Sequence, residues 1–259
     1  MNINKYAPPQ SIRGKFENFV SLGYFCSVAS ELERMGLRMC SGPFDWQASR
    51  SFEKRVLQID DEFKEFFEGL NENDLYQKRE EPKIYFHSLI DTFLVHDFNP
   101  YDPLESQLQT VTEKYKRRVA SFYQNIKKPT LFLHYIYNQK NAQWIVEHYT
   151  DILRAIQKFN ENNDIVFIAN KDIQINNVSC VYFVDPDKGD IVARRFLDKL
   201  PELRKFLKES SNIGLKSRFS NSLFYYRTKL KKKWFRITNN IKTSQQSPYI
   251  HNKIYEDCY

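Results

Sequence analysis

The chain has 259 residues, of which 41% are hydrophobic and 15% aromatic, and this composition excludes a collagen-like, low-complexity or intrinsically disordered protein. The net charge of +7 is uneven, because residues 204–242 hold 12 basic side chains and one acidic one, and the rest of the chain has a net charge of −4. The four cysteines are scattered and lack the spacing of a disulfide scaffold or a zinc site. No apolar segment is long enough to span a membrane, and none is placed as a signal peptide. We therefore expect a cytoplasmic protein without a metal or other cofactor.

Hydrophobic periodicity predicts the elements of the N-terminal half. In chain order they are a strand at residues 19–23, a helix that ends near Gly36, an amphipathic helix at 52–70, a polar loop at 71–82, short strands at 84–86 and 92–95, and a long helix at 107–126.

Strands and helices alternate regularly in the C-terminal half. The predicted elements are a strand at 130–136, a helix at 142–159, strands at 164–169 and 178–184, and a helix at 191–207. Near-continuous apolar strands that alternate with helices are typical of a parallel sheet buried on both faces. We therefore predict a three-layer, Rossmann-like α/β domain at residues 15–208, followed by a basic, aromatic helical tail at 209–259.

Cys26 is the first candidate for chemistry, since it falls between the first predicted strand and the helix that follows. A helix N-terminus stabilises a thiolate, and its free backbone N–H groups can hold an oxyanion. Ligands of open α/β sheets bind at the carboxyl ends of the strands. The alternative is that Cys26 is a small buried hydrophobic residue.

The segments around Cys26 resemble a known family. They are Ser21-Leu22-Gly23-Tyr24-Phe25-Cys26-Ser27-Val28-Ala29, Gly36-Leu37-Arg38, Pro43-Phe44-Asp45-Trp46 and the later pair His96-Asp97. Together they resemble the bacterial and viral family labelled "putative papain-like cysteine peptidase" over residues 18–135. The chain departs from that family at Tyr24-Phe25, where relatives often carry a polar residue, and its α/β pattern differs from the antiparallel barrel of papain.

The resemblance implies a role for each matching residue. Cys26 would be the nucleophile and His96 the base, and either Asp97 or Asp45 would orient the imidazole. Substrate-binding roles would fall on a further set: Gly23, Ser27, Arg38 and Trp46.

Each of these roles has an alternative. His87 is a rival base, and His134 lies in a core strand and is expected to be structural or to support the site from behind. A His-Asp pair can also tie down a loop. Asp45 and Trp46 could form a structural corner, in which the carboxylate caps a backbone turn and the indole fills the core.

The basic aromatic tail bears on the localisation of the protein and not on its reaction. Leu223, Phe224, Leu230, Trp234, Phe235 and Ile237 could enter a membrane interface while lysines contact anionic headgroups. A solvated terminal helix is the alternative. The mildly acidic body and the lack of a nucleic-acid-binding module make nucleic acid an unlikely partner.

The leading functional hypothesis is acyl transfer through Cys26 by a peptidase or related hydrolase, acting on a small-molecule, glycan or peptide substrate. A transferase that modifies surface polysaccharide or its lipid-linked precursor at the membrane is the first alternative. The second is a non-catalytic α/β binding module.

Overall fold

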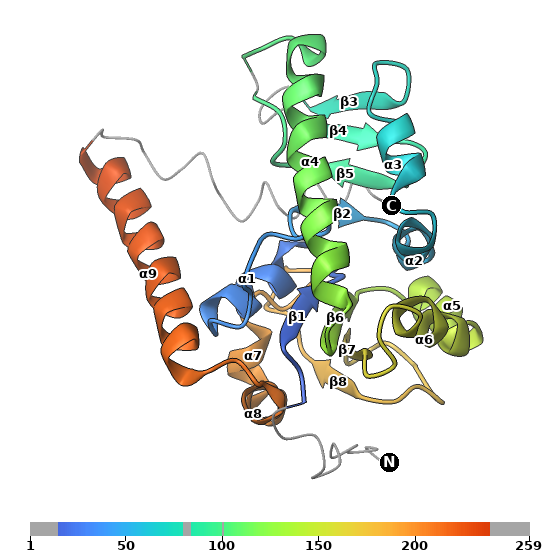
Figure 1. Ribbon diagram of the computed structural model, residues 1–259, viewed down its shortest axis with the longest axis vertical. Helices are drawn as coiled ribbons and strands as arrows, with labels where there is room; N and C mark the ends of the chain where they lie inside the picture. The colour runs from blue at the N-terminus through green and yellow to red at the C-terminus, as the bar shows by residue number, and fades with distance from the viewer. Residues whose placement is uncertain (1–14, 80–83, 100, 239–259) are drawn as a thin grey trace.

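The computed structural model describes residues 15–79, 84–99 and 101–238. Its centre is a four-stranded parallel sheet in the order β1-β6-β7-β8 (Figure 1). The strands are β1 (Asn18–Ser21), β6 (Thr130–Ile136), β7 (Asp164–Asn170) and β8 (Val181–Val184). This sheet confirms the predicted α/β class, and all seven residues of β6 are buried, as a central strand covered on both faces requires.

Helices cover both faces of the parallel sheet. Along β6, Leu131, Leu133 and Tyr135 pack into one hydrophobic cluster, and Phe132 and Ile136 pack into the other. The first face is covered by α1 (Cys26–Arg34), α7 (Phe196–Lys199) and α8 (Pro201–Ser210). The second is covered by α2 (Phe52–Asp60), α4 (Leu104–Ile126), α5 (Gln139–Glu147) and α6 (Tyr149–Gln157).

A second, antiparallel sheet stands beside the upper half of α4 in Figure 1. Its strand order is β2-β5-β4-β3, with β2 (Gln47–Ser49), β5 (Thr92–Leu94), β4 (Ile84–His87) and β3 (Leu75–Arg79). The strands predicted at 84–86 and 92–95 are present. The loop predicted at 71–82 is wrong in part, because β3 forms there by pairing with β4.

Three predicted helices are interrupted. The helix expected at 52–70 is α2 plus α3 (Lys64–Glu68), because the Asp61 carboxylate accepts hydrogen bonds from the backbone of Phe63 and Glu65 and starts a new helix. The helix expected at 142–159 is divided at His148 into α5 and α6. The helix expected at 191–207 starts late and divides at Pro201, which opens α8.

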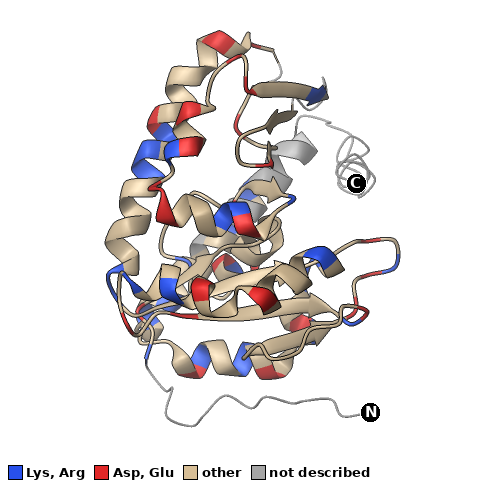
Figure 2. Cartoon of the chain, turned by 90° about the vertical axis from the view of Figure 1, so that its right-hand side faces the viewer, with Lys and Arg blue, Asp and Glu red and all other residues tan. Residues whose placement is uncertain are grey.

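The tail contains the long helix α9 (Leu215–Thr238), which packs on α1. The predicted segment 239–259 lies outside the described residues, and the domain division at residue 209 stays a prediction. Lysines, arginines and acidic residues are interspersed over the α/β body (Figure 2). Among the described residues, no helix is both long and apolar enough to span a membrane.

Gly36 makes the contact between α1 and α9 possible. Its φ is +70°, and a Cβ at this position would lie 2.0 Å from the backbone oxygen of Arg218 in α9. We expect Gly36→Ala to lower the free energy of unfolding by about 1–3 kcal/mol, because the clash is with backbone and the conformation is left-handed. Urea denaturation measures the loss. Gly214→Ala, where no atom lies within 4 Å of the new Cβ, is the matched control and should be nearly neutral; equal effects would contradict the prediction.

Candidate functional site

Cys26 is the first residue of α1, five residues after the end of β1. The turn between them is tight, because a Cβ on Gly23 would lie 2.8 Å from the backbone oxygen of Phe25. Phe25 is the N-cap of α1 and provides no side-chain cap, and the first turn holds no acidic residue. The first-turn N–H groups of α1 therefore have no side-chain acceptor at the cap.

The chain leaves β1 and β6 in opposite directions. After β1 it enters α1 on one face of the sheet, and after β6 it enters α5 on the other face. Such a divergence at the carboxyl ends of neighbouring parallel strands is where α/β proteins bind ligands. Here the rings of Tyr24 and Tyr137 stack at 3.6 Å, and Cys26 is half-buried nearby.

The surroundings of Cys26 favour the neutral thiol. The pKa of Cys26 is raised from 9.0 to about 12, chiefly by burial and to a smaller extent by the charge of Asp45. The backbone N–H of Cys26 itself and the charge of Arg194 act in the opposite direction. The groups found to shift this pKa include no histidine among the described residues. In the free protein, Cys26 is protonated at neutral pH.

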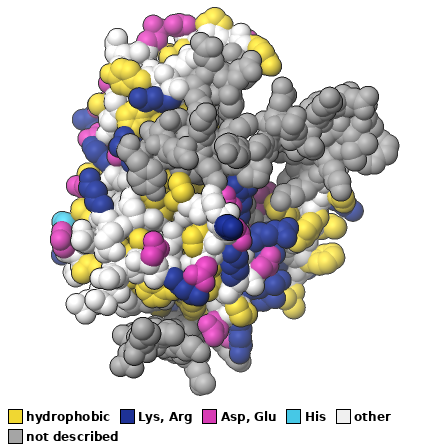
Figure 3. Space-filling model, turned by 180° about the vertical axis from the view of Figure 1, so that it is seen from behind, with side chains coloured by type: hydrophobic (Ala, Val, Ile, Leu, Met, Phe, Trp, Pro, Cys, Tyr) yellow, Lys and Arg dark blue, Asp and Glu magenta, His cyan; other side chains and the backbone are white. Residues whose placement is uncertain are grey.

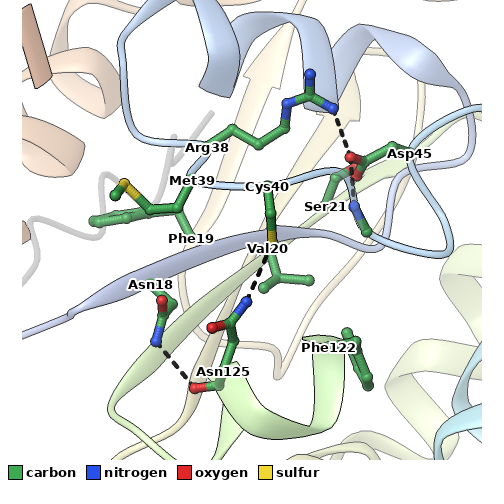
Figure 4. A pocket seen from close by; sticks show the side chains of 11 residues that line it. Asn18, Phe19, Val20, Ser21, Arg38, Met39, Cys40, Asp45, Phe122 and Asn125 are labelled. Carbon is green, nitrogen blue, oxygen red and sulfur yellow. Dashed lines mark hydrogen bonds and ion pairs between the residues drawn. The ribbon is translucent and has the colours of Figure 1, made fainter. Parts of the chain in front are cut away.

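Asp45 is buried and paired. Its Oδ2 lies 2.7 Å from Nη1 of Arg38 and accepts a hydrogen bond of 2.8 Å from the backbone N–H of Gly42 (Figure 4). Burial raises the pKa of Asp45, and the Arg38 guanidinium opposes this shift. Arg38 also pairs with Glu33 at 3.0 Å and lies over the ring of Trp46. The bond from Gly42 is the turn cap expected of a structural corner, whereas Trp46 is only half-buried and belongs to neither hydrophobic cluster.

The His-Asp pair is divided between two environments. The ring of His96 is exposed and meets the ring of Trp46 edge to face, with 6.3 Å between centroids. The carboxylate of Asp97 instead contacts α4: it accepts from the Tyr115 hydroxyl at 2.9 Å and pairs with Lys114 at 2.6 Å. Asp97 thus contacts α4, and Asp45 contacts Arg38 and Gly42.

Two other histidines are buried and bound to backbone carbonyls. His87 donates from Nε2 to the oxygen of Phe66, and burial lowers its pKa. His134 donates from Nδ1 to the oxygen of Leu22 at 2.8 Å, and burial lowers its pKa to about 3. His134 therefore fixes the turn that leads to Cys26, as a structural residue behind the site.

The predicted site residues are brought together only in part. Asp45 is near enough for its charge to act on Cys26, and Trp46 contacts His96. Gly23 and Ser27 flank the thiol along the chain, and the Ser27 hydroxyl is buried with no hydrogen-bond partner among the described residues. The charge of Asp45 thus acts on Cys26, while His96 contacts the neighbouring Trp46.

A small pocket of about 20 Å³ lies beside β1, with room for one or two water molecules (Figure 4). Cys40 lines it, and its Sγ accepts a hydrogen bond of 3.2 Å from the Asn125 amide. Cys26 is not among the lining residues, which are Asn18, Phe19, Val20, Ser21, Arg38, Met39, Cys40, Gly42, Asp45, Phe122 and Asn125.

Arg55 is a buried cation that the sequence interpretation did not single out. It has no exposed surface, and its Nε and Nη1 have no hydrogen-bond partner among the described residues. The guanidinium lies over the Phe44 ring at 5.0 Å, and burial lowers the pKa of Arg55 to about 9. The burial of Arg55 could have been predicted from its spacing in the sequence, because Arg55 shares the inward face of α2 with Phe52 and Ile59.

The described residues include no group of three or more His, Cys, Asp or Glu side chains that could hold a metal ion. A family model described as "Putative papain-like cysteine peptidase" matches residues 17–172, which is more than half of the chain. No curated protein and no solved structure matches.

Proposed function

Because this chain belongs to the family described as "Putative papain-like cysteine peptidase", we propose that it is a cysteine-dependent acyl-transfer enzyme in which Cys26 is the nucleophile. The observation that carries the proposal is the position of Cys26 at the N-terminus of α1, beside the carboxyl ends of β1 and β6. Ligands of open α/β sheets bind outside the carboxyl ends of the strands, and the first turn of α1, which has no side-chain cap from Phe25, lies next to the thiol.

In the proposed reaction, the Cys26 thiolate attacks the carbonyl carbon of an acyl substrate. The sulfur–carbon bond forms, and the first-turn N–H groups of α1 hold the oxyanion of the tetrahedral intermediate. Collapse of the intermediate breaks the bond to the leaving group, which takes a proton from the imidazolium of His96. Water or a sugar hydroxyl then receives the acyl group from sulfur and regenerates the thiol.

Formation of the thiolate is the demanding step of this mechanism. Burial holds the pKa of Cys26 near 12, so the proton must pass to a base, and the positive charge of Arg194 favours the thiolate that is formed. His96 is the proposed base, and it is exposed beside Trp46 in the free protein. In this proposal the enzyme is inactive until a substrate is bound.

A non-catalytic α/β binding module is the second candidate, and one observation favours it. The raised pKa of Cys26 is that of a structural thiol, and the carboxylates of Asp45 and Asp97 already have partners in Arg38 and in Lys114.

Trapping of an acyl-enzyme tests the proposal. We expect p-nitrophenyl acetate or a peptide thioester to leave an acyl group on the Cys26 peptide, detected by mass spectrometry. Cys26→Ser should remove the thioester adduct and the turnover. His96→Ala should slow acylation by about 100-fold or more, the usual contribution of a general base.

Cys180→Ser is the matched control for Cys26→Ser. The Cys180 thiol is also half-buried, and burial raises its pKa to about 11. Full activity is expected in this variant. Acylation of all cysteines at similar rates, or turnover that survives Cys26→Ser, would contradict the enzyme and favour the binding module.

A further inference from the structure

One face of α9 is occupied by its contact with α1. The Ser222 hydroxyl donates to the backbone oxygen of Arg34 at 2.9 Å, and the Asn221 amide lies 3.4 Å from the oxygen of Gly36. Tyr225 is buried on the same side of α9. These residues follow the helical repeat of three and four, so they define a single docking face.

A second face of α9 is apolar and exposed. Its five residues are spaced by 4, 4, 3 and 4 positions, which places them in one stripe along the helix, about 110° around the axis from the docking face. Their exposed fractions run from 37% to 81%. The apolar stripe consists of Leu215, Phe219, Leu223, Tyr226 and Leu230.

Exposed basic residues border the apolar stripe. Because an α-helix turns by roughly 100° per residue, the exposed residues Lys216, Arg227 and Lys231 lie on the side of the stripe that is away from the docking face. None of the 24 residues of α9 is acidic, and eight are Lys or Arg. Figure 3 shows hydrophobic side chains beside dark blue basic ones along the right-hand edge of the molecule, the side on which α9 lies.

We propose that the apolar stripe and basic flank of α9 form a membrane-binding face that lies on an anionic lipid surface. The stripe would enter the boundary between headgroups and acyl chains, and the basic flank would contact the headgroup phosphates or carboxylates. Charge complementarity favours this occupant over a second copy of the chain, because two such helices would bring their cations together without acidic partners. Five adjacent exposed apolar side chains favour a lipid surface over nucleic acid, whose phosphates offer them no contact.

The apolar stripe, basic flank and docking face all lie outside residues 17–172, so this inference does not depend on the proposed function. Two of the six apolar residues expected from the sequence to enter a membrane are found in the stripe. Leu223 and Leu230 belong to the stripe, while the side chains of Phe224, Trp234, Phe235 and Ile237 lie outside the description.

Vesicle flotation of the full chain tests the proposal. We expect the protein to float with vesicles of phosphatidylcholine and phosphatidylglycerol in equal parts, and to stay in the bottom fraction with pure phosphatidylcholine. Phe219→Glu and Leu223→Glu should each reduce partitioning by about tenfold or more, since each removes the burial of a large apolar side chain. Replacement of Lys216, Arg227 and Lys231 by Gln should reduce it by about fivefold per residue.

Tyr101→Glu is the matched control, because it places the same charge at an aromatic residue that is 86% exposed and precedes α4. This variant should float like the parent chain. The melting temperature of each variant is measured, and only variants that melt at the same temperature as the parent chain are compared. Unfolding is thereby separated from loss of membrane binding.

Three outcomes would overturn the proposal. The first is equal flotation with charged and neutral vesicles, or none with either. The second is a dimer in analytical ultracentrifugation that Phe219→Glu dissociates without lipid. The third is binding to a single-stranded RNA oligonucleotide that the Gln substitutions abolish and Phe219→Glu leaves unchanged.

Discussion

At neutral pH, iodoacetamide is expected to alkylate Cys26 of the folded protein on the order of 1,000-fold more slowly than the same cysteine in the urea-unfolded chain. Burial raises the pKa of Cys26 from 9.0 to about 12, and each pKa unit lowers the thiolate fraction about tenfold. Only the thiolate reacts at an appreciable rate. Cys40, which is exposed, should be labelled before Cys26.

The pH dependence of the Cys26 alkylation rate is a second test of this prediction. The alkylation rate of Cys26 should rise about tenfold per pH unit and continue to rise above pH 9.0, without a plateau. Between pH 9.0 and about 12 the unfolded chain releases this proton and the folded chain keeps it, so Cys26 lowers the free energy of unfolding as the pH rises.

Mass spectrometry of the Cys26 and Cys40 peptides over time gives both rates in one sample. A faster reaction at Cys26 than at Cys40, with a plateau below pH 8, would show that the thiolate already exists in the free protein. Slow alkylation together with rapid acylation by a bound substrate is the pattern that the proposed mechanism requires. Slow alkylation without any acylation would contradict the enzyme and favour the non-catalytic binding module.

Asp97→Asn is expected to lower the free energy of unfolding by about 2–4 kcal/mol. The Asp97 carboxylate is 2% exposed and is the counter-charge of Lys114, at 2.6 Å, with Arg118 at 3.9 Å. The variant leaves these cations without their carboxylate and weakens the hydrogen bond from the Tyr115 hydroxyl. Both cations keep some contact with water, which places the expected loss below that of a fully buried pair.

Urea denaturation measures this loss, and Asp151→Asn is the matched control. Asp151 pairs with Arg154 at 2.7 Å on the surface of α6, where both side chains are well exposed. This variant should change the stability by less than about 1 kcal/mol. If Asp97→Asn is as stable as the parent chain and yet loses acyl transfer, Asp97 orients His96 and is not a structural anchor.

Local signals predicted most of the α/β domain. The apolar runs of β1, β6 and β7 and the periodicity of α4 needed no knowledge of their partners, because a strand or helix that is buried shows its period in its own residues. The prediction failed at helix boundaries. Asp61 and His148 interrupt helices through hydrogen bonds and backbone angles that the period of apolar residues does not record.

The antiparallel sheet shows a different kind of failure. β3 is mostly polar, and it is a strand because β4 pairs with it. β2 has three residues and is held by β5, more than forty positions later in the chain. Strand formation in such segments depends on a partner, so a window of sequence holds little information about it.

For the candidate site, the sequence alone determined which residues stand at the junction of β1 and α1 and that the positive charge is concentrated near the C-terminus. Only the tertiary structure decided what surrounds them: Asp97 contacts α4, Asp45 contacts Arg38, and burial keeps Cys26 protonated. The physical reason is that pKa values and ion pairs depend on burial and on groups brought together by folding. For α9, the sequence shows the apolar and basic composition, but the exposed face of the helix is determined by its packing on α1.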